Sequence, residues 1–189
     1  DIGRTHYVQT VNLAVQVFNI NGTPLTAPFK MSSLFTALGA SNICATDDDG
    51  DPIVLYDHLA DRWMISQFAL TSPFHQCVAV SQTGDATGAY YVYDLVMPNN
   101  FANDYPHFGV WPDAYYMTDN QFNASLTAFT GAGVFAYDRS KMLVGDPTAT
   151  YIYFDQPAAL GIGGQLPSDL DGPPPPMGTT RQSISGRSA

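Results

Sequence analysis

The sequence predicts an all-β fold, and within that class a partial β-propeller of about two and a half four-stranded blades. Four strand-like segments recur in the same order after roughly 54 residues, a period typical of propeller blades. All 17 acidic residues are Asp, and only two Lys are present, so favoured helix formers are scarce. The 11 Tyr, 11 Phe, 16 Gly and 14 Pro instead supply strand and turn residues.

The N-terminal part predicts two strands, over residues 5–11 and 13–18, because apolar and polar side chains alternate there. Asn21-Gly22 predicts the turn that follows them. Residues 29–38 form the one segment with a helical pattern, and Gly39 is expected to end that helix. This part of the chain would supply the half blade.

Each copy of the repeat predicts four strands. The segments of the first copy are residues 51–56, 63–65, 77–80 and 91–94. Those of the second copy are residues 105–111, 116–118, 134–137 and 151–155. The offset between copies grows along the chain, and we expect a longer loop around residues 121–130 to cause it.

Half a blade and two full blades do not close a ring, and propellers usually need four to eight blades. The chain is therefore expected to be a fragment of a longer chain or to form a homo-oligomer. An open β-sandwich is the alternative fold. We assign residues 1–156 to the β-propeller-like domain. Residues 157–189 are expected to be a linker or tail rich in Pro, Gly and Ser, because they include Pro173–Pro176 and hold no aromatic residue.

The net charge of −10 argues against binding to nucleic acid or to anionic lipid headgroups. No apolar run approaches the roughly 20 residues that span a bilayer, so membrane insertion is not expected. Cys44 and Cys77 predict one disulfide, with two buried thiols as the alternative. An acidic chain with few Lys and many Asn and Tyr favours a secreted or cell-surface location, where disulfides persist.

Several motifs resemble one family of large secreted bacterial proteins, whose N-terminal module is sialidase-like or β-propeller-like and whose function is uncharacterised. The motifs are residues 49–57, 59–63, 77–85, 104–106, 109–113, 115–117 and 138–143. The resemblance covers about residues 1–176. It implies a propeller-type fold and secretion, and it transfers no catalytic residues.

The densest charge in the chain lies just before the first repeat, where Asp47, Asp48, Asp49 and Asp51 fall within five residues. Carboxylates this close repel one another unless a hard cation or solvent neutralises them. Calcium takes six to eight oxygen ligands and suits such a loop. The sequence therefore predicts a calcium site here, with a solvated acidic turn as the alternative.

In propellers, the loops that enter the innermost strands gather on one face around the axis. By this analogy the candidate catalytic residues are Asp51, Asp104, His107 and Asp119. The candidate ligand-binding residues are Trp111, Tyr115, Tyr116 and Asn120, whose rings and amide suit a sugar. Alternatively, the Asp residues cap strand ends and the aromatic residues fill the core. We expect a binding or structural module of a larger surface protein that recognises glycan or protein. The alternative is a glycoside hydrolase with paired Asp residues.

Overall fold

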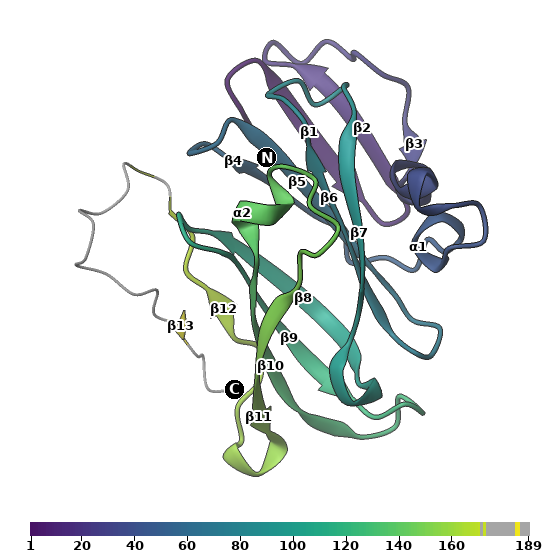
Figure 1. Ribbon diagram of the computed structural model, residues 1–189, viewed down its shortest axis with the longest axis vertical. Coiled ribbons are helices and arrows are strands. Elements are labelled where there is room, and N and C mark those ends of the chain that lie inside the picture. The colour runs from purple at the N-terminus through teal and green to yellow at the C-terminus, as the bar shows by residue number, and fades with distance from the viewer. Residues whose placement is uncertain (171, 173–183, 186–189) are drawn as a thin grey trace.

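The structure is a computed structural model that describes residues 1–170 and 172, and the backbone of residues 184–185. The fold is all-β, with three antiparallel sheets of three, four and four strands and a further two-stranded pair (Figure 1). The run of Pro at residues 173–176, which belongs to the expected linker or tail, lies outside the described residues. Within the described part of the chain, no helix is long and apolar enough to cross a membrane.

Sheet A consists of β1 (His6–Val11), β2 (Ala14–Asn19) and β3 (Phe29–Lys30). The two predicted N-terminal strands are thus confirmed. The helix predicted over residues 29–38 begins two residues later, as the 3-10 helix η1 (Met31–Leu38), because Phe29 pairs with Val15 in the sheet. Gly39 ends η1 with φ 105°, as expected. The short helix α1 (Ile43–Thr46) follows.

Sheets B and C share one topology, four antiparallel strands in chain order. Sheet B consists of β4 (Ile53–Asp57), β5 (Arg62–Ala69), β6 (His75–Ser81) and β7 (Tyr90–Val96). Sheet C consists of β8 (Ala102–Val110), β9 (Tyr115–Phe122), β10 (Phe129–Tyr137) and β11 (Tyr151–Pro157). The short helices between and after these strands are η2 (Pro98–Asn100), α2 (Arg139–Met142) and η3 (Ala158–Leu160).

Each of the eight predicted segments overlaps one of these strands. The loop expected around residues 121–130 is confined to residues 123–128, because β9 extends to Phe122 and β10 already begins at Phe129. Strand pairing continues into this region, with Phe122 opposite Phe129. The longer connection instead joins β10 to β11 and contains α2.

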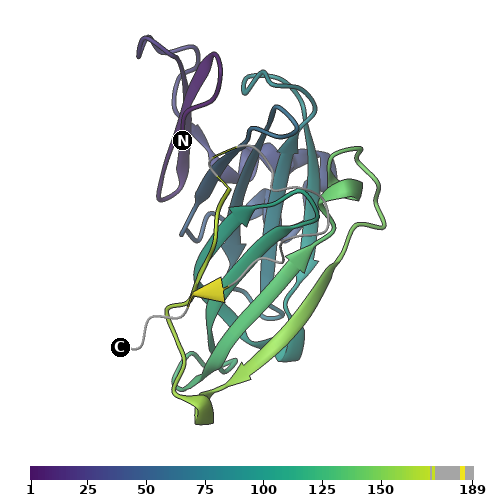
Figure 2. The same ribbon diagram turned by 90° about the vertical axis from the view of Figure 1, so that its left-hand side faces the viewer.

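The three sheets stack face to face, with sheet B in the middle. Alternate residues of β5 point to opposite sides: Trp63 and Ile65 pack against sheet A, whereas Met64 packs against sheet C. In Figure 2 the purple N-terminal hairpin and the green strands of sheet C lie on either side of sheet B. The first strands are neighbours, since β4 contacts both β1 and β8. We call β4 and β8 the inner strands.

The C-terminal segment, residues 161–169, lies on the outer face of sheet C, the face turned away from sheet B. Its short strand β12 (Leu166–Pro167) contacts β8 and β9 and pairs with β13 (Ile184–Ser185). Thr118 Oγ1 donates to the Gln165 carbonyl at 2.6 Å. A Cβ on Gly109 would lie 2.3 Å from the Ser168 carbonyl oxygen, so only glycine permits this approach. Residues 161–169, expected as linker, are therefore packed against the sheet.

Candidate functional site

The four predicted catalytic residues lie along the start of β4, the first two thirds of β8 and the neighbouring strand β9. Asp51 precedes β4, while Asp104 and His107 belong to β8, which contacts β4. Asp104 stands opposite Asn120 of β9, next to Asp119. The charge of Asp51 acts on both Asp104 and His107, and that of Asp104 acts on Asp119. We call this group the inner-strand site.

Asp119 is the buried member of the inner-strand site. Its side chain is 2% exposed, and its Oδ1 accepts a hydrogen bond from Gly133 N at 2.9 Å. Its Oδ2 has no partner among the described residues. Burial, with a smaller contribution from Asp104, raises the pKa of Asp119 to about 8. Gly133 makes room for it, because a Cβ there would lie 2.4 Å from Oδ1. Asp119 is thus a neutral acid near pH 7, out of reach of a large ligand.

Asp104 is the accessible member. The strand is irregular between Asp104 and His107, and Tyr105 has a φ of 54° and is 51% exposed. Desolvation raises the pKa of Asp104, and the charge of Asp51 adds to the effect. Desolvation lowers the pKa of His107, whose Nε2 is buried with no partner in the described part of the chain. The Tyr105 ring meets that of His107 edge-on at 4.3 Å. A neutral imidazole and a carboxyl group of raised pKa suit hydrogen bonding to a polar ligand.

A buried polar layer lies behind this site, between sheets B and C. Asn103 Nδ2 donates to Gln76 Oε1 at 2.7 Å, and Tyr153 OH donates to Gln121 Oε1 at 2.9 Å. Asn103 Oδ1 and Gln121 Nε2 are buried and have no hydrogen-bond partner within the described residues. Sequence reasoning missed this layer. The available signal was polar residues at inward positions of otherwise apolar strands, such as Gln76 beside Val78.

Of the predicted ligand-binding residues, only Asn120, which stands opposite Asp104, adjoins the inner-strand site. Tyr115 is fully buried and donates to Asp57 Oδ2 at 2.8 Å. The Trp111 indole donates to the Ser168 carbonyl at 3.0 Å, and Asn120 Oδ1 accepts from Gly164 N at 2.8 Å. Tyr116 lies on the outer face of sheet C. Three of the four therefore face the C-terminal segment or the outer face, and the fourth belongs to the core.

The Tyr115 hydroxyl donates to a buried ion pair, Asp57 with Arg139, that the sequence did not reveal. Arg139, from α2, donates to both oxygens of Asp57, at 2.7 Å from Nε and 3.0 Å from Nη2. Asp57 is fully buried at the end of β4, and the Arg139 guanidinium lies 5.7 Å from the Tyr115 ring centre. This contact joins sheet C to sheet B and is structural.

The predicted calcium ligands have partners within the chain. Asp48 accepts from Ser32 N and Oγ, and its Oδ2 lies 3.4 Å from Lys30 Nζ. Asp47 accepts from the hydroxyl groups of Thr46 and Thr71, and Asp49 accepts from Leu70 N. Asp51 instead acts on Asp104. No group of three or more His, Cys, Asp or Glu side chains that could hold a metal ion is found in the described part of the chain. Calcium binding stays a prediction.

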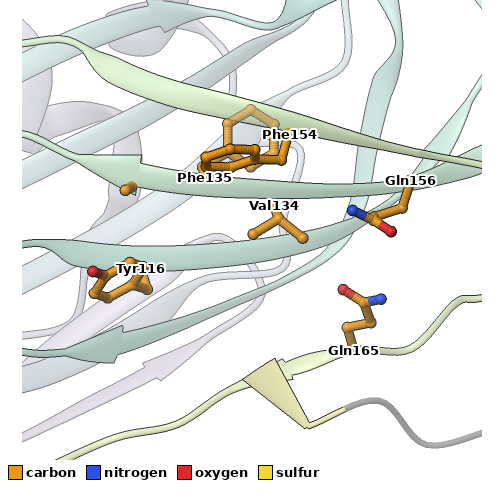
Figure 3. Close-up of a pocket in the computed structure, with 7 residues that line it drawn as sticks. Tyr116, Val134, Phe135, Phe154, Gln156 and Gln165 are labelled. Atoms are coloured by element: carbon orange, nitrogen blue, oxygen red, sulfur yellow. The ribbon is translucent and has the colours of Figure 1, made fainter. Parts of the chain in front are cut away.

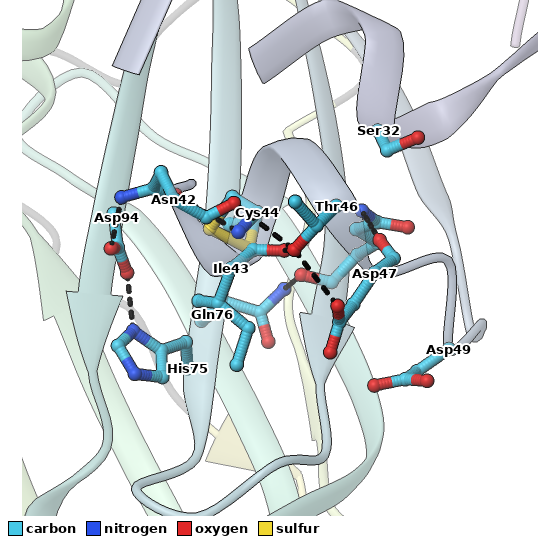
Figure 4. The surroundings of a disulfide bond; sticks show 12 residues. Ser32, Asn42, Ile43, Cys44, Thr46, Asp47, Asp49, His75, Gln76 and Asp94 are labelled. Atoms are coloured by element: carbon cyan, nitrogen blue, oxygen red, sulfur yellow. Dashed lines mark hydrogen bonds and ion pairs between the residues drawn. A yellow bond between two sulfur atoms is a disulfide. The ribbon is translucent and has the colours of Figure 1, made fainter. Parts of the chain in front are cut away.

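The predicted disulfide is confirmed. Cys44 of α1 is bonded to Cys77 of β6, with the Cα atoms 5.7 Å apart, and both residues are fully buried (Figure 4). The bond fastens α1 to the face of sheet B that is turned away from sheet C. Beside it, Asn42 Nδ2 donates to Asp94 Oδ2 at 2.8 Å, and the other oxygen of Asp94 contacts His75 Nδ1.

The outer face of sheet C carries a groove of about 430 Å³ (Figure 3). The Tyr116 and Phe154 side chains lie along it with Val134, and the amides of Gln156 and Gln165 stand together at one end. Gln165 Oε1 is buried and has no partner among the residues that the structure describes. The groove thus combines aromatic and aliphatic side chains with two amide groups at one end.

Comparison with known proteins leaves the chain without a match among protein-family models, curated proteins or solved structures.

Proposed function

We propose that the chain is a secreted, propeller-type binding or structural module of a larger surface protein, with the inner-strand site as its recognition face. The observation that carries the proposal is that Asp51, just before β4, lies near enough to Asp104 of the neighbouring strand β8 for its charge to raise the pKa of Asp104. Carboxyl groups and an exposed Tyr105 suit the hydroxyl groups and apolar faces of a glycan.

Two further observations support the proposal. Three sheets in series, with β1, β4 and β8 as neighbours, fit successive blades better than the two layers of an open sandwich. The disulfide between Cys44 and Cys77 fits an oxidising compartment outside the cell.

The second candidate function is a glycoside hydrolase. The observation that favours it is the raised pKa of Asp104 beside a second carboxyl group, that of Asp51. Glycosidases pair one acid of raised pKa, which protonates the leaving oxygen, with a carboxylate that acts as nucleophile or base. In this mechanism Asp104 would be the acid and Asp51 the nucleophile or base. Asp119 is too deeply buried for either role.

Binding to a glycan array and turnover of aryl-glycosides and polysaccharides test both candidates. The variants are Asp51→Asn and Asp104→Asn, and Asp146→Asn, in an exposed loop between β10 and β11, is the control. A binding module should lose at least tenfold in affinity with either site variant. A hydrolase should keep its affinity and lose turnover by about 10²-fold or more. Equal affinity and equal turnover of all three variants would mean that the inner-strand site serves neither candidate function.

Calcium at the acidic loop is a separate prediction of the sequence. Thermal unfolding in excess calcium and in excess chelator tests it. Equal unfolding midpoints would leave Asp47, Asp48, Asp49 and Asp51 as turn and capping groups.

A further inference from the structure

The inner-strand site carries negative charge that has no counter-charge among the described residues. Asp51 lies near enough to Asp104 for its charge to act on that carboxyl group, yet neither residue forms an ion pair within the described part of the chain. Asp104 is exposed and Asp51 is partly buried. Like charges repel, and solvent ions screen partly buried charges less than exposed ones. A ligand that brings a positive charge is therefore favoured at this site.

The cationic side chains of the described residues are engaged elsewhere. Four of them form ion pairs: Arg4 with Asp61, Lys30 with Asp48, Arg139 with Asp57, and Lys141 with Asp138. The fifth, Arg62, donates to the carbonyl oxygens of Ala60 and Asp61. Arg181 and Arg187 lie outside the described residues. None of the five described cations is thus paired with Asp51 or Asp104.

His107 does not supply a positive charge either. Desolvation lowers its pKa, against the opposing charge of Asp51, so the imidazole is neutral near pH 7. Beside it lies the Tyr105 ring, which is 51% exposed and meets the His107 ring edge-on at 4.3 Å. The face of an aromatic ring binds both the apolar side of a sugar and a cation. Tyr105 therefore suits a ligand that joins an ammonium group to a sugar ring.

Asp119 is a separate indication that the site suits a cation. Its side chain is 2% exposed, and its Oδ2 has no hydrogen-bond partner among the described residues. The charge of Asp104 adds to the effect of burial in raising the pKa of Asp119. A positive charge held at Asp104 would offset that contribution. Although Asp119 lies too deep to touch a sugar, a bound ammonium group would stabilise its ionised form as well.

We propose that the inner-strand site recognises amino sugars, with the carboxyl groups of Asp51 and Asp104 binding the ammonium group of a 2-amino-2-deoxy sugar. The inference rests on the proposed function and names the class of glycan. An N-acetylated sugar lacks the positive charge. A uronic acid adds a negative charge to a chain whose net charge is already −10. The expected order of affinity is amino sugar, then N-acetylated sugar, then uronic acid.

Isothermal titration calorimetry of the whole chain with three trisaccharides, of glucosamine, N-acetylglucosamine and galacturonic acid, tests the proposal. At about pH 6 and low salt, the glucosamine trimer should bind at least about tenfold more tightly than the N-acetylated trimer. The galacturonic acid trimer should not bind measurably. Salt at about 0.5 M should remove most of the preference. Lowering the pH to about 4 should also reduce it, because Asp104, whose pKa is raised, then takes up a proton and loses its charge.

Two variants at the site and one control separate local recognition from general attraction. Asp51→Asn and Asp104→Asn should each reduce the preference for the glucosamine trimer to about threefold or less. Asp146→Asn, in the loop between β10 and β11, removes the same charge elsewhere and should keep the preference of the wild type. Because all three variants have the same net charge, a general attraction of cations to an acidic protein would affect them equally. Circular dichroism checks that each variant is folded.

Equal affinity of the wild type for the glucosamine and N-acetylglucosamine trimers, or tighter binding of the galacturonic acid trimer, would overturn the inference. In that case, weaker binding of the preferred trimer to Asp104→Asn would still support the proposed function, so the two can fail separately. A preference that Asp146→Asn reduces as much as Asp104→Asn does would also overturn the inference. Binding of none of the three trimers would contradict both the inference and the glycan recognition on which it rests.

Discussion

Sheets B and C have the same strand order, yet they differ in what covers them. Both faces of sheet B are packed, one against sheet A and the helices, the other against sheet C. Within the residues that the structure describes, sheet C is packed on one face and only half covered on the other. Leu95 of β7 is 8% exposed, whereas Phe154 of β11, on the corresponding strand and face, is 56% exposed. Sheets with the same strand order therefore differ in burial according to what packs against them. Four predictions test this difference.

The largest expected effect comes from the acidic residues that end the inner strands. Asp57, the last residue of β4, is buried against Arg139, whereas Asp113, in the turn after β8, is exposed and accepts from Tyr116 OH at 2.9 Å. Asp57→Ala leaves the Arg139 charge buried without its partner and should cost about 3–5 kcal/mol of unfolding free energy. Asp113→Ala should cost less than about 1 kcal/mol. Urea denaturation measures both costs. Similar costs for the two variants would contradict the difference in burial between Asp57 and Asp113.

The second prediction concerns the disulfide, which fastens a helix to sheet B. Replacing Cys44 and Cys77 together by Ala should cost about 3–4 kcal/mol, because the bond closes a loop of 33 residues. Urea denaturation of the double variant, with reduced wild type as the control, gives the value. A loss below about 1 kcal/mol would mean that packing alone holds α1 on sheet B.

The third prediction compares equivalent apolar side chains. Leu95→Ala opens a cavity between sheets B and C and should cost about 2–3 kcal/mol. Phe154→Ala should cost less than about 1 kcal/mol, because Phe154 is 56% exposed. Thermal unfolding at low protein concentration tests the pair. If Phe154→Ala destabilised the dilute chain as much as Leu95→Ala, the outer face of sheet C would be packed within one molecule.

The fourth prediction is a pH dependence, which is the smallest of the four effects when it is expressed per pH unit. The pKa of Asp119 is raised from 3.8 to about 8 in the folded chain. Between these values the unfolded chain has lost the proton and the folded chain keeps it, so stability falls as pH rises, by at most about 1.4 kcal/mol per pH unit. Asp119→Asn should flatten this slope and stabilise the protein at pH 8. Chemical denaturation from pH 5 to 8 tests this, with Asp155→Asn as the control. A slope unchanged in Asp119→Asn would contradict the buried acid.

Strand positions could be read from the sequence, but the faces of the strands could not. The repeat aligns Trp63 with Tyr116, and Cys77 with Val134. In the structure, Trp63 and Cys77 face sheet A and its helices, whereas Tyr116 and Val134 face away from sheet B. Because side chains alternate along a strand, an error of one residue in an alignment exchanges the two faces.

The same limit applies to the candidate site. Asp51, Asp104, His107 and Asp119 were grouped from the expected loop positions, and the structure places them along the start of β4, the first two thirds of β8 and the neighbouring strand β9. The burial of Asp119 could not be predicted, since it depends on the space above Gly133 of the next strand.

By itself, the sequence determined the class of fold, most strand positions and the cysteine pair, because local residue preferences and alternation carry that information. The tertiary structure alone decided which carboxyl groups are buried, which aromatic rings are core and which sheet face stays open. Asp57 and Arg139 are 82 residues apart in the chain and form one ion pair. Contacts of this kind depend on how whole sheets pack, and local residue preferences do not encode that packing.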